Sequence, residues 1–181
     1  ICFSSVQTNL VDEQIALGKA QYQGLLIKSE YLYAALGSLQ AVRQQFGDRY
    51  KVCPRSMVFG SQEWRQRKNF LPELEIAYDN GERTRTMDFD SIVMLSASEP
   101  LRDQIAFVTE PTWFTEKDEL MSNRLPVFVP EKMAQELGVT ASAVNSAQDD
   151  GGVAAVINGR EVYIRGIFNA ASYSAIRDLD G

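Results

Sequence analysis

The sequence VAAVINGREVYIRGIF, residues 153–168, predicts two β-strands joined by a tight turn. Asn158-Gly159 separates two apolar runs, and both residue types tolerate the positive φ angles that a two-residue hairpin turn requires. We therefore expect strands over residues 153–157 and 160–168. The expected core residues are Val162, Ile164 and, beyond a kink at Gly166, Phe168, and the expected solvated residues are Arg160, Glu161 and Arg165.

A strand and a helix are expected just before this hairpin. Residues 127–129 are typical of a short buried strand. Pro130 suits the first position of a helix, Glu131 suits the positive end of its dipole, and Gly138 is placed to end it. Residues 149–152 are expected to form the turn that enters the hairpin.

The first half of the chain predicts a β-α-β unit. Residues 30–46 carry apolar side chains at helical spacing, with Ser29 placed to cap the helix and Gly47 to stop it. A parallel strand pair with a right-handed crossover is expected around this helix. The candidate strands are residues 24–27, 50–53 and 57–59.

A second hairpin is expected after this unit. The turn sequence Asp79-Asn80-Gly81 separates a strand over residues 74–78 from a strand over residues 84–95. Prolines and charges then change the composition, which places a lobe boundary near residues 98–100. A short helix over residues 172–179 ends the series.

These elements together predict an α+β fold of two lobes. The first is an outer α/β lobe, residues 1–98, which contains the β-α-β unit and which residues 169–181 would complete. The second is a smaller, mostly β lobe inserted over residues 99–168, with hairpins and a short helix.

Composition excludes several functional classes. The chain has 181 residues, of which 45% are hydrophobic and 23% charged, and it contains no His. Without His there is no Ser-His-Asp or Cys-His nucleophile and no imidazole metal ligand. The net charge is −6, and residues 91–181 carry the whole excess, with 7 Lys and Arg against 13 Asp and Glu. This acidity argues against nucleic acid as a partner.

The residue patterns favour no catalytic, cofactor or metal site. Cys53 lies beside Pro54 and Arg55, but it lacks a base, so a core thiol or a disulfide with Cys2 is the preferred interpretation. The two alternatives stay open. Three acidic groups fit solvated turns: Glu116/Asp118/Glu119, Asp149/Asp150 and Asp178/Asp180. The group at Asp178/Asp180 begins like a calcium loop but lacks the later ligands.

Trp113 and Phe114 are the candidate partner-contact residues. They form a bulky apolar pair at the start of an acidic stretch. One interpretation is an anchor that holds a long loop onto the second lobe, and this is favoured. The other is a docking surface for a second protein, because Trp is common at interface centres.

Three segments in order resemble the MacB-like periplasmic core domain of ABC-transporter permeases of the FtsX-like family. They are Trp113-Phe114-Thr115 with the acidic stretch, the strand and helix VFVPEKMAQELG of residues 127–138, and the hairpin INGREVYIRGIF of residues 157–168. The resemblance covers mainly residues 110–168. It departs from the family where Asp149-Asp150-Gly151-Gly152 replaces the usual entry to the hairpin, and where the family's domain commonly continues beyond the hairpin.

The resemblance implies a non-catalytic domain without cofactors on the periplasmic or extracytoplasmic face, tethered to the inner membrane by helices outside this chain. Its partners would be the permease's own membrane helices, a cytoplasmic ATPase and a periplasmic adaptor protein, in efflux or lipoprotein-type transport. The isolated domain is expected to be a monomer, and the parent a homodimer or heterodimer. The alternative is a stand-alone extracytoplasmic ligand-binding or sensor module.

Overall fold

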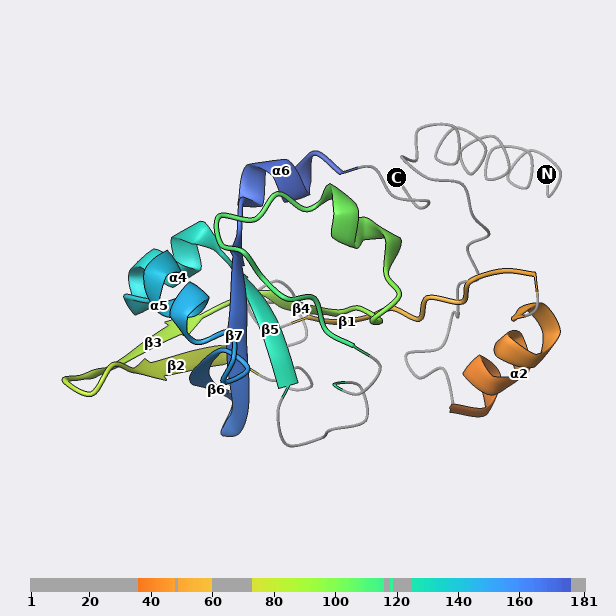
Figure 1. The fold of residues 1–181 in the computed structure, drawn as a ribbon. Helices are drawn as coiled ribbons and strands as arrows, with labels where there is room; N and C mark the ends of the chain where they lie inside the picture. The colour runs from red at the N-terminus through yellow and green to blue at the C-terminus, as the bar shows by residue number, and fades with distance from the viewer. Residues whose placement is uncertain (1–35, 48, 60–72, 116–117, 119–124, 177–181) are drawn as a thin grey trace, which may run out of the picture. The chain divides into compact units, whose positions relative to one another are not determined.

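The chain has an α+β fold, as the sequence predicts. The computed structural model describes residues 36–47, 49–59, 73–115, 118 and 125–176 (Figure 1). The chain forms two compact units, one of residues 1–50 with 174–181 and the other of residues 51–173. No helix in the described ranges combines the length and the apolar character that a membrane crossing requires.

In the first unit the structure describes one helix, α2, which spans Leu36–Phe46. Gly47 follows it, and a Cβ atom at this position would lie 2.4 Å from the carbonyl oxygen of Arg43. Glycine is therefore needed where the helix ends, as predicted. The expected helix start at residues 30–35 and the expected strand at residues 24–27 lie outside the described residues.

The second unit contains a five-stranded sheet. The strand order is β3-β2-β6-β7-β5, and every neighbouring pair is antiparallel except β5 and β7, which are parallel. The strands are β2 (Glu75–Asp79), β3 (Thr84–Asp88), β5 (Leu125–Pro130), β6 (Val153–Ile157) and β7 (Arg160–Phe168). Both predicted hairpins are present, and Asn158 and Gly159 have φ angles of 48° and 78°.

Two short helices and one face of this sheet enclose the core. Helix α4 (Glu131–Leu137) contacts β3, β5 and β7, and α5 (Ala141–Ser146) contacts β7 (Figure 1). The least exposed side chains are Ile76, Leu137, Val144 and Ile164. The sequence predicts α4 and its end at Gly138, which has a left-handed φ of 80°. It predicts no helix at α5, which the Thr140 side chain caps.

The expected long strand over residues 84–95 is wrong. It is divided into β3 and β4 (Ser91–Met94), and the Phe89 N–H donates to the Leu74 carbonyl at the division. Strand β4 pairs antiparallel with β1 (Ser56–Phe59) in a separate two-stranded sheet. Residues 50–53 form no strand, and β1 pairs antiparallel with β4. The expected parallel pairing with residues 24–27 stays a prediction, because that segment lies outside the described residues.

The expected solvation of Arg165 is also wrong. The β5–β7 register passes from Val127 opposite Ile164 to Phe128 opposite Gly166, which leaves Arg165 as an extra residue in a β-bulge. The bulge confirms the predicted kink, but it shifts the alternation of faces. Ile167, which is 4% exposed, therefore takes the core position predicted for Phe168, and Arg165 is 9% exposed.

The last helix begins earlier than predicted. Helix α6 spans Ala170–Ser174, and the Asn169 side chain accepts from the Ser172 N–H at its start. It ends at Ser174, earlier than the predicted residue 179, and residues 177–181 lie outside the described residues. The lobe boundary near residues 98–100 stays a prediction, and the five-stranded sheet combines strands from both sides of that position.

Candidate functional site

Residues 105–115, here called the strap, lie along the end of β7. The Val108 N–H donates to the Ile167 carbonyl at 2.8 Å, and the Asn169 N–H donates to the Ala106 carbonyl at 2.9 Å. The Ile167 N–H donates to the Thr109 hydroxyl at 3.0 Å. Strand β6 pairs with β7 only as far as Ile164. The strap therefore takes over the β7 hydrogen bonds that β6 leaves open.

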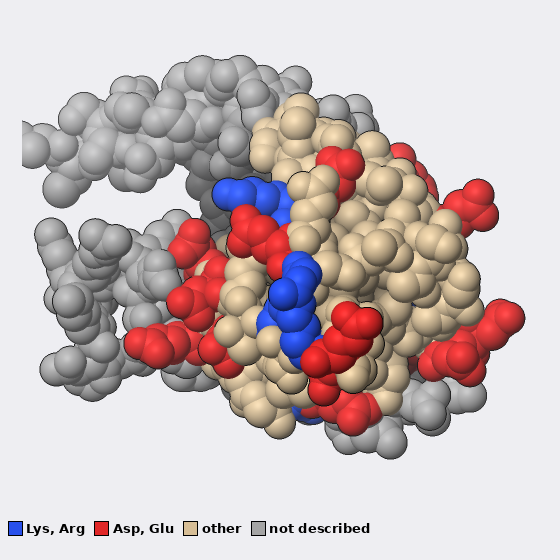
Figure 2. Space-filling view, turned by 90° about the vertical axis from the view of Figure 1, so that its left-hand side faces the viewer, with Lys and Arg blue, Asp and Glu red and all other residues tan. Residues whose placement is uncertain are grey.

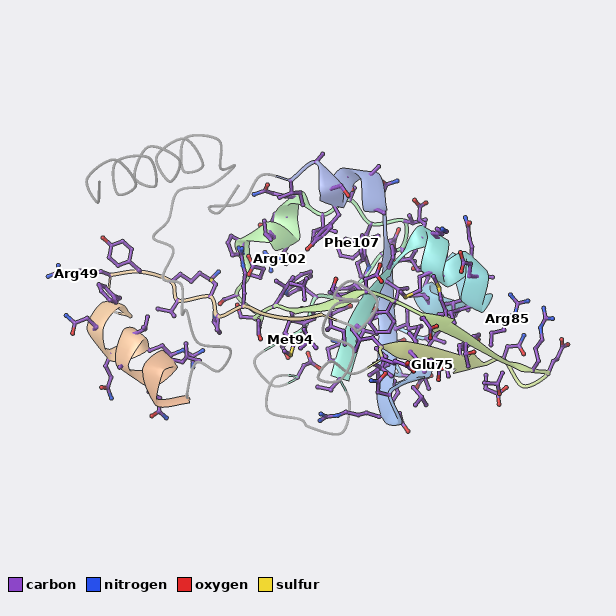
Figure 3. All side chains as sticks on the ribbon, turned by 180° about the vertical axis from the view of Figure 1, so that it is seen from behind. Arg49, Glu75, Arg85, Met94, Arg102 and Phe107 are labelled. Atoms are coloured by element: carbon purple, nitrogen blue, oxygen red, sulfur yellow. The ribbon has the colours of Figure 1, made fainter. Side chains whose placement is uncertain are left out.

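Four aromatic rings join the strap to β5. We call them the aromatic cluster, and they are Phe107, Trp113, Phe114 and Phe128. The centroids of Trp113 and Phe114 lie 5.0 and 5.3 Å from that of Phe128, in stacked arrangements. Phe107 meets the same ring edge-on at 5.1 Å and lies near the end of β7 (Figure 3). These geometries are favourable for aromatic pairs.

Trp113 and Phe114, the candidate partner-contact residues, are each half-buried in this cluster. Their contact with Phe128 is the one expected of residues that anchor a loop. A contact with another protein stays a prediction. The Trp113 Nε1 atom is buried and has no hydrogen-bond partner among the described residues, and the same holds for Gln104 Oε1.

Gly166 allows the strap to approach the sheet closely. A Cβ atom there would lie 2.8 Å from Pro111 Cβ and 2.9 Å from Phe128 Cδ1. Neither neighbour is the end of a flexible side chain, so a larger residue would force the strap away from β7. Glycine at position 166 is therefore required for the aromatic cluster to form.

Arg165 binds Asp118, which lies just beyond the strap in the sequence. Its guanidinium donates to both carboxylate oxygens of Asp118 at 3.2 Å, and its Nε donates to the Gly151 carbonyl at 3.3 Å. The Thr115 N–H and hydroxyl also donate to Asp118, at 2.7 and 3.0 Å. Burial raises the pKa of the Asp118 carboxyl, but the hydrogen bonds from Arg165 and Thr115 outweigh it and lower this pKa below its ordinary value.

Asn145 in α5 and Gln148, two residues beyond its end, hold the middle of the strap. The Thr112 N–H donates to Gln148 Oε1 at 3.2 Å, and Gln148 Nε2 donates to the Arg165 carbonyl at 2.7 Å. The Glu110 N–H donates to Asn145 Oδ1 at 3.1 Å. The sequence did not indicate these residues, because no helix was predicted there and nothing local marks their partners.

A second polar cluster surrounds Glu99. Arg55 Nε and Nη2 donate to the two Glu99 oxygens at 2.8 and 2.7 Å, and the Glu99 side chain has no exposed surface. Arg55, which lies near Cys53 in the sequence, therefore binds a carboxylate. The Cys53 thiol donates to the Ser98 carbonyl at 3.2 Å, and it is a free thiol among the described residues. Cys2 lies outside them.

The acidic groups do not assemble into a metal site within the described ranges. Asp149 and Asp150 are exposed in the turn before β6, as expected of solvated acids. Asp118 belongs to the Arg165 contact described above. Glu116, Glu119, Asp178 and Asp180 lie outside the described residues.

The chain was compared with protein families, curated proteins and solved structures. No family model matches it, and no curated protein or solved structure does so either.

Proposed function

We propose that this chain is a non-catalytic extracytoplasmic domain of an ABC-transporter permease of the FtsX-like family. In this role it passes the ATP-driven motion of membrane helices to an adaptor protein or to the cargo. The proposal includes a two-lobed domain, in which β2 pairs with β6 across the expected lobe boundary. It rests on the resemblance of three segments and on the way these segments meet.

The observation that carries the proposal is that the three resembling segments converge on one place. Trp113 and Phe114 come from the first segment, Phe128 from the second and Gly166 from the third. Both aromatic rings of the first segment stack on Phe128, and Gly166 leaves room for the Phe128 ring. The residues that carry the resemblance therefore also form the contact between the strap, β5 and β7.

The strap is suited to a mechanical role because side chains fix it at several points. The Arg165–Asp118 pair, Gln148 and the aromatic cluster tie it to three separate elements. A displacement of the strap would therefore be transmitted to the sheet and to α5 together. Interfaces of this kind change between discrete arrangements rather than deforming gradually.

The first test is to determine the parent reading frame on both sides of the chain. The proposal expects apolar runs of about 20 residues, one upstream and about three downstream. If the flanks contained a cleavable signal and a stop codon instead, the permease proposal would fail. The stand-alone sensor would then be tested by ligand-induced stabilisation of the free domain.

The second test uses the complete permease with its ATPase. Phe114→Ala is expected to reduce transport while the basal ATP hydrolysis rate stays unchanged, because the strap is loosened far from the nucleotide site. Phe114→Tyr should restore transport, and Val156→Ala, at an exposed position on β6, serves as the matched control. Normal transport in Phe114→Ala, with the protein folded, would contradict a coupling role for the strap.

A further inference from the structure

The two Asn-Gly pairs of the chain occupy chemically different surroundings. Asn80-Gly81 lies at the tip of the β2–β3 hairpin, and Asn158-Gly159 forms the β6–β7 turn. Asn-Gly is the sequence in which the backbone nitrogen of glycine can most easily reach the asparagine side-chain carbon, because glycine has no side chain to obstruct it. The structure therefore allows the two sites to be compared within one molecule.

The side-chain carbonyl of Asn80 is polarised by backbone donors. The N–H groups of Glu82 and Arg83 donate to Asn80 Oδ1 at 3.1 and 3.0 Å. Two backbone donors on one carbonyl oxygen polarise the carbonyl and stabilise the negative charge that an attacking nucleophile places on that oxygen.

The attacking nitrogen has a base beside it. The Gly81 N–H donates to the Asp79 carboxylate at 2.8 Å, which is within the range for proton transfer to a general base. Residues 79–83 are all exposed, so water reaches the site. Figure 2 shows the face of the molecule on which this tip lies, where acidic side chains outnumber basic ones.

Asn158 differs from Asn80 because its side-chain amide nitrogen, the group that must leave, is also hydrogen-bonded. Its Nδ2 donates to the Glu73 carbonyl at 2.7 Å, and its Oδ1 accepts from the Glu75 N–H at 2.9 Å. Both ends of the amide are therefore held against the chain that leads into β2. Loss of the amide nitrogen from Asn158 would break the bond to Glu73, and the side chain is restrained from turning toward Gly159.

We propose that Asn80 is a site of self-catalysed deamidation and that Asn158 is protected. The Gly81 nitrogen forms a bond to Asn80 Cγ and gives its proton to the Asp79 carboxylate. The C–N bond to Nδ2 then breaks, and Nδ2 leaves as ammonia with that proton, which produces a succinimide. Water opens the ring at either carbonyl to give aspartate or isoaspartate, with no oxidation or reduction.

The product changes the hairpin tip in two ways. Either product adds a negative charge beside Asp79 and Glu82, and isoaspartate also lengthens the backbone of the loop at residues 80–83. Since β3 is at the edge of the sheet, the change is confined to an exposed turn. The modification would thus alter the surface of the protein without opening its core.

The experiment is to incubate the folded 181-residue chain at constant pH and follow both asparagines by tryptic peptide mass spectrometry. Cleavage after Lys68 and Arg83 isolates Asn80, and cleavage after Lys132 and Arg160 isolates Asn158. Fragmentation spectra identify the modified residue. We expect Asn80 to convert about tenfold faster than Asn158, a modest effect for a general base because the site is open to water. In the urea-unfolded chain the two rates should become similar.

Asp79→Asn tests the base, since it keeps the shape of the side chain and removes its charge. Asn80 should then convert several-fold more slowly, whereas the matched control Glu82→Gln, one residue beyond the Asn-Gly pair, should leave the rate unchanged. Far-UV circular dichroism checks that each variant is folded. Equal rates at Asn80 and Asn158 in the folded chain, or an unchanged Asn80 rate in Asp79→Asn, would overturn the proposal.

Discussion

Gly166→Ala is expected to destabilise the second unit, because the added methyl group would push the strap away from the sheet. The added methyl group would lie 2.8 Å from Pro111 and 2.9 Å from the Phe128 ring, and both must move. Overpacking of this kind costs about 1–3 kcal/mol. A Gly→Ala change returns up to about 1 kcal/mol, because alanine restricts the unfolded chain. Because both contacts are shorter than 3.0 Å, we expect a cost in the upper part of the overpacking range, about 2–3 kcal/mol, and a net loss of about 1–2 kcal/mol in the free energy of unfolding.

The assay is urea unfolding followed by far-UV circular dichroism, with the midpoint lowered and the m value unchanged. Phe128→Leu reduces the ring that obstructs the new methyl group, so the double variant should lose less stability than the sum of the single variants. Val156→Ala, on the exposed side of β6, should change the stability by about 0.5 kcal/mol or less. A Gly166→Ala protein as stable as the parent, or strictly additive losses, would refute the close approach of strap and sheet.

Three further predictions concern the polar contacts and the core. Glu99→Gln should cost about 2–3 kcal/mol in urea unfolding because it leaves the partly buried Arg55 without its carboxylate, whereas Asp103→Asn in the exposed Arg102–Asp103 pair should change little. The pKa of Asp118 is lowered in the folded state, so its contribution to the free energy of unfolding is complete above about pH 4 and is lost as pH falls further. Asp118→Asn should therefore show a shallower loss of stability between about pH 5 and pH 3. An unchanged slope would contradict the role of the Arg165 contact. Ile164→Ala, which truncates a side chain with 0% exposure, should cost about 3–4 kcal/mol by thermal or urea unfolding, and a loss below about 1 kcal/mol would place this residue outside the core.

The parts of the fold that the sequence predicts correctly depend on local chemistry. Asn158-Gly159 requires a tight turn because both residues adopt positive φ angles, and the flanking strands follow from their apolar alternation. Helix α4 is predicted because Pro130 and Gly138 mark its two ends within the sequence itself. Helix α5 is not, since its Ala- and Ser-rich sequence has little apolar periodicity and only Thr140 signals its start.

The candidate site was predicted only in part. Trp113 and Phe114 stand out in the sequence because a bulky apolar pair next to acidic residues is unusual. The hydrogen bonds from Gln148 and Asn145 to the strap could not be predicted, because nothing in the sequence distinguishes these two polar residues from others. Only the folded structure brings them next to the strap. Arg165 was expected in solvent for the same reason, because its partner Asp118 is distant in the sequence.

The sequence by itself determined the turns, the glycines that end two helices and the α+β class, because each depends on the conformational limits of a few adjacent residues. The tertiary structure alone decided which face of β7 enters the core after Ile164, since one extra residue in the bulge reverses the alternation. It also decided that the run of residues 84–95 divides between two sheets. Both outcomes depend on hydrogen bonds between distant segments, and such bonds leave no periodic signal in the chain.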